Sequence, residues 1–258
     1  MEYLIDLLAD ELTKSASDIY KHTMRAYLDT AIRSSNAQFH KQEFISRLDV
    51  KLLQANEKDR GWEVFLLDYK VSDLTPLSTI FTEEVMNNYN KIFSFMLKLK
   101  KIQHSLSLSW GDTMSNQKQF RRLSADLQAK FHRFNLAHHE MAHFVSNIHN
   151  YILVEVLESA WTVFQNGLDQ VEDLDSLITL QKKFVLDILD KALLSDQQKE
   201  LYKLLQRLLN HVFTFTLTKE KYVYQSALQE SERLERVHRN QQLGKEVPEE
   251  DLQCVLHY

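Results

Sequence analysis

Glycine and proline are scarce in this sequence, whose 258 residues include only 4 Gly and 2 Pro. Average proteins contain about 7 % Gly and about 5 % Pro. The chain therefore has few of the residues that end helices and build tight turns, which favours long helices. It also has no Gly-rich stretch, and this excludes the usual phosphate-binding loops.

Other absences exclude further classes of protein. A single cysteine, Cys254, cannot form an intrachain disulfide; it suits a reducing compartment, and we expect an inert thiol. The net charge of −5 and the lack of a dense Lys/Arg block argue against nucleic-acid binding. The most apolar run, YILVEVL, is interrupted by Glu155 and is too short to span a bilayer. With no basic n-region of a signal peptide, we expect a cytosolic protein that binds neither nucleic acid nor membrane.

The spacing of apolar residues predicts a mainly α protein, an elongated helical bundle with long helices. One helix is expected around Tyr20–Ala31. Thr82 and the two glutamates after it are typical of a helix start, and we expect that helix to end near Leu106. A polar linker around Gly111 should follow. Tyr89, Phe93 and Phe95 lie at helical spacing, which favours core positions over a stacking platform.

The second half of the sequence predicts three more helices. They are expected at 120–166, closed by Gly167; at 174–194; and from Ser195, whose S-x-x-Q capping box with Gln198 opens a last helix toward Gly244. We expect the chain to divide into N-terminal helices with a hairpin (1–107), a long-helix bundle (108–244) and a tail (245–258).

Between residues 47 and 71 the apolar residues no longer follow helical spacing and instead recur at every second position. Leu48, Val50 and Leu52 alternate with polar residues, and the apolar positions of Phe65–Val71 do the same. This alternation predicts a short β-hairpin within the helical protein. The connector ends in Gly61, a residue free to adopt positive φ.

The stretch HHEMAHF contains the pattern H-E-x-x-H at His139, Glu140 and His143. On a helix, this pattern can hold zinc with the glutamate as general base, so a zinc-dependent hydrolase is the alternative reading of the chain. On a helical wheel, however, both histidines lie about 160° from the apolar stripe around Met141. No third ligand is evident, so we expect exposed histidines, no metal and no cofactor.

Glu155 falls near the apolar arc of the same predicted helix. We expect a partly buried, hydrogen-bonded carboxylate there, and the alternative is a residue that contacts a partner.

Several stretches together resemble the C-terminal part of the gamma-tubulin complex proteins. They are NAQF (Asn36–Phe39), RLDVKLL (Arg47–Leu53), GWEVFLLDYKV (Gly61–Val71), HEMAHF (His139–Phe144) and YILVEVLESAW (Tyr151–Trp161). No motif is specific alone, but their order and spacing match over roughly Tyr3 to Leu234. In that family the position of His139 need not be His, so the resemblance implies that the zinc pattern arises by chance.

The resemblance implies a non-catalytic scaffold at the centrosome or spindle pole body. In this family a second grip motif, the part matched here, binds gamma-tubulin. Neighbouring complex proteins assemble side by side and hold gamma-tubulins in a ring that templates microtubule growth. The lateral first grip motif is absent here, so we expect gamma-tubulin binding that is weak and does not nucleate microtubules.

The residues that contact gamma-tubulin cannot be identified from spacing alone. As candidates we take the polar residues that should point outward from the hairpin, Asp49, Lys51, Asp68 and Lys70. The alternative reading is a solvated strand face without a partner.

Overall fold

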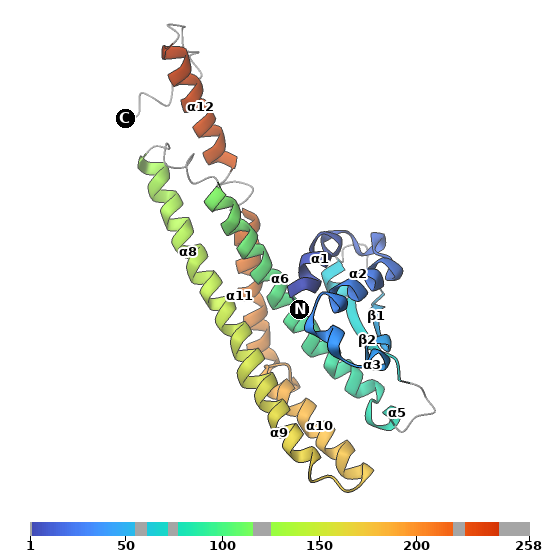
Figure 1. Cartoon of the computed structure of the whole chain (residues 1–258). Helices are drawn as coiled ribbons and strands as arrows, with labels where there is room; N and C mark the ends of the chain where they lie inside the picture. The colour runs from blue at the N-terminus through green and yellow to red at the C-terminus, as the bar shows by residue number, and fades with distance from the viewer. Residues whose placement is uncertain (1, 55–60, 72–76, 116–124, 219–224, 243–258) are drawn as a thin grey trace. The chain divides into compact units, whose positions relative to one another are not determined.

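The computed structural model describes residues 2–54, 61–71, 77–115, 125–218 and 225–242 (Figure 1). These residues form two compact units. Unit 1 contains residues 1–104 and 145–209, and unit 2 contains residues 105–144 and 210–258. The expected mainly α fold with long helices and one short β-hairpin is confirmed.

The helical elements of unit 1 range from three residues in η1 and η4 to the long helix α6, whose full length is 33 residues. They are α1 (Glu2–Thr13), η1 (Ala16–Asp18), α2 (Lys21–Arg33), η2 (Asn36–Phe39), α3 (Gln42–Ser46), α4 (Gly61–Val64), α5 (Leu77–Ile80), the first part of α6 (Glu83–Ser115), the end of α8 (Ala125–Asn150), η3 (Tyr151–Glu158), α9 (Ser159–Leu168), α10 (Leu174–Lys191), η4 (Asp196–Gln198) and the first part of α11 (Lys199–Thr218).

The predicted hairpin is confirmed. Strand β1 (Leu48–Leu52) pairs antiparallel with β2 (Phe65–Tyr69), so that Leu48 lies opposite Tyr69 and Leu52 opposite Phe65. The helical turn α4 stands directly before β2, where the sequence had predicted strand or connector. Gly61 opens this turn because of close packing: an added Cβ would lie 2.9 Å from Leu12 Cα and 3.0 Å from Leu12 O.

The largest apolar core of unit 1 lies on one face of the hairpin. It is built by buried side chains from α1, α2, both strands and α6: Ile5, Leu8, Leu12, Ile19, Met24, Leu28, Ala31, Ile32, Val50, Phe65 and Leu97. Burial of apolar area at about 25 cal/mol per Å² is the main term that holds such short helices in place. Phe95 is also buried, as the helical spacing of the aromatics had predicted.

Helix α6 begins where the sequence predicted and ends later. The Val85 N–H donates to Thr82 Oγ1 at 3.4 Å, which confirms the expected cap. The helix then runs through Gly111 to Ser115, so the expected linker around Gly111 is wrong. A single Gly costs only about 1 kcal/mol in a helix. Packing offsets that cost here, because Ser109 and Thr113 are buried on either side of Gly111.

The long helical stretch predicted before Gly167 is confirmed over its described part. It is not an α-helix throughout. Helix α8 continues into η3, a π-helix, and then α9, which ends one residue after Gly167 (Figure 1). Buried positions recur every four residues across both helices, at Ile152 and Val156 in η3 and at Ala160 and Phe164 in α9.

Glu155 lies within the π-helix, away from its buried positions Ile152 and Val156. Its side chain is exposed, so the expected part-buried carboxylate is wrong. The wheel centred the apolar arc on Met141, whereas the buried residues of this stretch are His138, Val145, His149, Ile152 and Val156.

The connection from α10 to α11 contains a left-handed leucine. Leu193 has φ 62°, and the Leu194 N–H donates to Leu189 O at 2.8 Å, as in a Schellman C-cap. Ser195 precedes η4 and α11, but its side chain makes no cap hydrogen bond, so the predicted capping box is not formed. Among the described residues neither Ser195 Oγ nor Gln198 Oε1 has a hydrogen-bond partner.

Unit 2 is held by aromatic contacts between helices. The Phe134 and Phe215 rings stack with centroids 5.6 Å apart. His138 is buried, stacks on Trp110 at 5.7 Å and directs Nε2 to Leu106 O at 3.0 Å. The described parts of the last predicted helix are α11 and α12 (Gln225–Gln242), and residues 219–224 lie outside the described residues. Cys254 and the predicted tail also lie outside them.

Candidate binding surface

The polar side of the hairpin contains a buried carboxylate. Asp49 is 2 % exposed. Lys70 Nζ lies 2.8 Å from its Oδ2, Lys21 Nζ 3.3 Å from the same oxygen, and Arg25 Nη1 3.4 Å from Oδ1. Helix α2 packs against β1 and places Lys21 and Arg25 one turn apart above the strand. The hydrogen bond from Lys70, helped by the Val50 N–H and Lys21 and opposed by burial, holds the pKa of Asp49 far below its usual value.

The four hairpin residues selected from the sequence therefore differ in how far their side chains are exposed. The prediction that Asp49 points to solvent is wrong, because period-two alternation cannot show that α2 covers this part of the strand. Lys51 and Lys70 are exposed and Asp68 is half-buried. Lys51, Asp68 and Lys70 stay predictions as partner contacts, whereas Asp49 acts inside the fold.

The H-E-x-x-H residues lie on the exposed side of α8. His139, Glu140 and His143 are all exposed, whereas the neighbouring His138 is buried. Within the ranges that the structure describes, no group of three or more His, Cys, Asp or Glu side chains could hold a metal ion. A catalytic zinc site needs three protein ligands, so this geometry lacks what the alternative reading requires. In the same ranges, no helix combines the length and apolarity needed to cross a membrane.

A cleft of about 890 Å³ lies in unit 1 between the end of the hairpin, α6 and the α10–α11 connection. Two kinds of side chain line it. The apolar ones are Leu53, Leu66, Leu194 and the ring of Tyr202; the polar ones, all from α6, are Glu83, Glu84, Asn87, Asn88, Asn90, Lys91 and Ser94. Sequence reasoning missed this cleft. The available signal was the NNYN run, since three asparagines are unfavourable in a helix unless their amides have a role.

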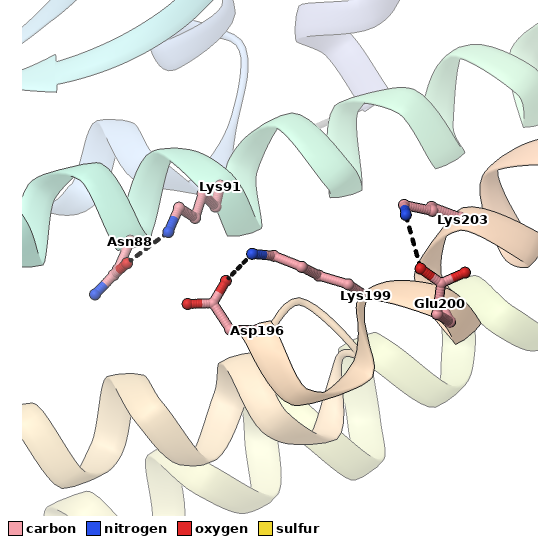
Figure 2. A network of polar contacts seen from close by, with 6 residues as sticks. All are labelled: Asn88, Lys91, Asp196, Lys199, Glu200 and Lys203. Atoms are coloured by element: carbon pink, nitrogen blue, oxygen red, sulfur yellow. Dashed lines mark hydrogen bonds and ion pairs between the residues drawn. The ribbon is translucent and has the colours of Figure 1, made fainter.

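Near the cleft, polar side chains close in sequence contact one another (Figure 2). Lys91 Nζ donates to Asn88 Oδ1 at 3.3 Å on α6. On the other side Lys199 Nζ lies 2.8 Å from Asp196 Oδ1. The hydrogen bond and charge of Lys199 lower the pKa of Asp196, and the charge of Lys91 adds to this. Exposed pairs of this kind add little stability, so their polar groups can rearrange around a ligand.

Part-buried contacts hold α6 against α10 and α11. Gln181 Nε2 donates to the Tyr89 hydroxyl at 2.5 Å, and the Phe95 and Tyr202 rings meet edge-on at 5.8 Å. Burial raises the pKa of both tyrosines. Lys98 Nζ also donates to Gln206 Oε1. The cleft walls are therefore built from packed elements.

Comparison with known proteins decides the family. Residues 1–253 match the family described as "Gamma tubulin complex component C-terminal". The chain belongs to this family. One similar protein is Spindle pole body component 98 of Dictyostelium discoideum, which is 35 % identical over 93 % of this chain and 29 % of the relative. Gamma-tubulin complex component 3 of Homo sapiens is 33 % identical over 90 % of this chain and 25 % of the relative.

As a gamma-tubulin complex component relative, the chain spans between a quarter and three tenths of the length of these proteins. The Xenopus laevis homolog of component 3 gives a similar match, 34 % identical over 89 % of this chain and 25 % of the relative. The resemblance inferred from RLDVKLL, HEMAHF and YILVEVLESAW is thus confirmed.

Proposed function

We propose that this chain is a gamma-tubulin-binding scaffold module of a microtubule-nucleating complex. One observation carries the proposal: nearly the whole chain matches the C-terminal region of the gamma-tubulin complex components, and its relatives bear the names of such components and of spindle pole body proteins. Other complex proteins are proposed as further partners. The centrosome or spindle pole body, in the cytoplasm, is the proposed location.

The charge of the chain indicates how it binds. The chain carries −5 and tubulins are acidic, so long-range charge attraction between the two is unfavourable. We infer that apolar and main-chain contacts supply the affinity. Binding should then depend weakly on ionic strength, because screening affects interactions between exposed charges most.

No catalytic step is part of this proposal. A zinc hydrolase would need a metal at His139 and His143, and the described residues around them provide no third ligand. The His139→Ser variant should therefore bind gamma-tubulin as the parent chain does.

Titration of labelled gamma-tubulin with the chain tests the proposal. We expect saturable binding whose Kd changes less than about 3-fold between about 50 and 200 mM salt. A version extended at both ends should bind more tightly if flanking segments contribute, and should be compared in the same assay. Absence of binding by both proteins would refute the proposed function. A steep loss of affinity with salt would refute the proposed mode of binding.

A further inference from the structure

One side of α11 carries three exposed leucines. Leu201, Leu204 and Leu208 are each 52 % exposed, and all three belong to unit 1. The helix is nonetheless packed into the fold, because the next residue, Leu209, is fully buried. Single exposed apolar side chains are normal on a protein surface, whereas several together mark an interaction site. We call these three residues the leucine stripe.

The spacing of the leucine stripe is that of a seam between two helices. At 100° per residue the three side chains fall within about 60° of one another. Side chains three and four residues apart are neighbours on a helix, and apolar residues at these separations pack one helix along another. About half of each side chain remains open to solvent in this chain. The stripe therefore offers a second molecule a surface that fits a helix.

Basic side chains border the leucine stripe. Lys203 and Arg207 are exposed, lie one turn apart and each come directly before a leucine of the stripe. Lys203 Nζ lies 2.7 Å from Glu200 Oε1, a pair within α11 itself (Figure 2). In the described part of the chain, Arg207 makes no hydrogen bond or ion pair. Its guanidinium favours a carboxylate on the covering molecule, because arginine binds carboxylates through two parallel hydrogen bonds.

We propose that an amphipathic helix of gamma-tubulin packs along the leucine stripe and pairs a carboxylate with Arg207. This inference rests on the proposed function and locates its contact. The chain as a whole carries −5, so the basic border is a local exception, and it suits a partner from the acidic tubulins. Burial of the leucines supplies the affinity, while the ion pair at the border sets the orientation of the helix. Such an interface depends weakly on salt, as the proposed mode of binding requires.

The combined replacement of Leu204→Gln and Leu208→Gln tests the apolar contact. Glutamine has a helix propensity close to that of leucine, so α11 should remain folded. We expect the Kd for gamma-tubulin to rise about 10-fold or more. The matched control combines Leu77→Gln with Leu174→Gln, at leucines that are 37 % and 45 % exposed at the starts of α5 and α10. It should leave the Kd within about 2-fold of the parent value.

The ion pair has its own variants. Arg207→Glu should weaken binding about 3-fold or more, because it places two negative charges together. Lys41→Glu makes the same change of charge at an exposed position before α3 and should leave the Kd unchanged. If Arg207→Glu binds as the parent does, the proposed acidic partner surface is refuted.

Hydroxyl-radical footprinting of the unmodified chain makes the test independent of variant folding, because it labels exposed side chains directly. Gamma-tubulin should protect residues 201–208, and unchanged labelling there would overturn the inference. Equal binding by the leucine variant and its control would overturn it too, while the proposed function stands. If the parent chain fails to bind gamma-tubulin, the proposed function fails and this inference with it. If the leucine variant loses self-association in sedimentation but not gamma-tubulin binding, the stripe serves a second copy and the proposed occupant is wrong.

Discussion

Replacing Asp49 with Asn should destabilise the fold far more than any other polar change on the hairpin. The substitution keeps the shape of the side chain but removes the charge that binds Lys21, Arg25 and Lys70. Removing one partner of a buried ion pair costs about 3–5 kcal/mol. The three cations are 44–56 % exposed and can return to water, so we expect a smaller cost of about 2–4 kcal/mol.

The pH dependence follows from the lowered pKa of Asp49. A carboxyl whose pKa is lower in the folded than in the unfolded state stabilises the fold above the unfolded value. That stability is lost as the pH falls from about 4 toward the folded pKa. The amide of the Asp49→Asn variant does not titrate. The difference in unfolding free energy between parent and variant should therefore be constant from pH 7 to about pH 5 and shrink below about pH 4.

Urea unfolding at several pH values measures both effects. Asp68→Asn is the matched control, because Asp68 lies directly opposite Asp49 on β2, is half-buried and makes no ion pair among the described residues. Its loss should change stability by less than about 0.5 kcal/mol. If Asp49→Asn costs no more than Asp68→Asn, or if the difference is the same at pH 3 and pH 7, the ion-pair reasoning is refuted.

Further predictions concern the glycines, the left-handed leucine and zinc. Gly61→Ala should destabilise the fold by about 1–3 kcal/mol, because the added Cβ would press on the Leu12 main chain. Gly111→Ala should stabilise it by about 0.4–1 kcal/mol, because a Cβ added there meets no atom within 4 Å. Equal effects of the two variants in urea unfolding would contradict this. Leu193→Gly should raise stability by about 0.5–1 kcal/mol by relieving the strain at φ 62°. Leu193→Ala, which keeps that strain, should not raise it. His139→Ser should change stability by less than about 0.5 kcal/mol; stoichiometric zinc in metal analysis of the purified chain would overturn the reading of this surface.

Local patterns predicted those parts of the fold that neighbouring residues determine. The period-two alternation in RLDVKLL and FLLDY located both strands, and Thr82 located the start of α6. The gamma-tubulin complex resemblance came from the order of short motifs spread over the chain. Such features need no knowledge of what packs against them.

Features that depend on distant packing were predicted poorly. The burial of Asp49 requires α2, which comes before it in the sequence, to cover the strand. The helix through Gly111 depends on the packing of Ser109 and Thr113, and no spacing rule indicated the π-helix at Tyr151–Glu158. The cleft combines residues as far apart as Leu53 and Tyr202, so no local window of sequence contains it.

A buried carboxylate joins the hairpin to the helix that comes before it in the sequence. Asp49 lies on β1 and binds Lys21 and Arg25 of α2 and Lys70 directly after β2. One side chain thus connects α2 with both arms of the hairpin, so a change at Asp49 acts on the folded state itself. Lys51 lies on the same strand but is exposed, and changes at exposed positions usually alter stability by less than about 0.5 kcal/mol. A loss of partner binding in a Lys51 variant would therefore report on a contact, whereas the same loss in an Asp49 variant would report on the fold.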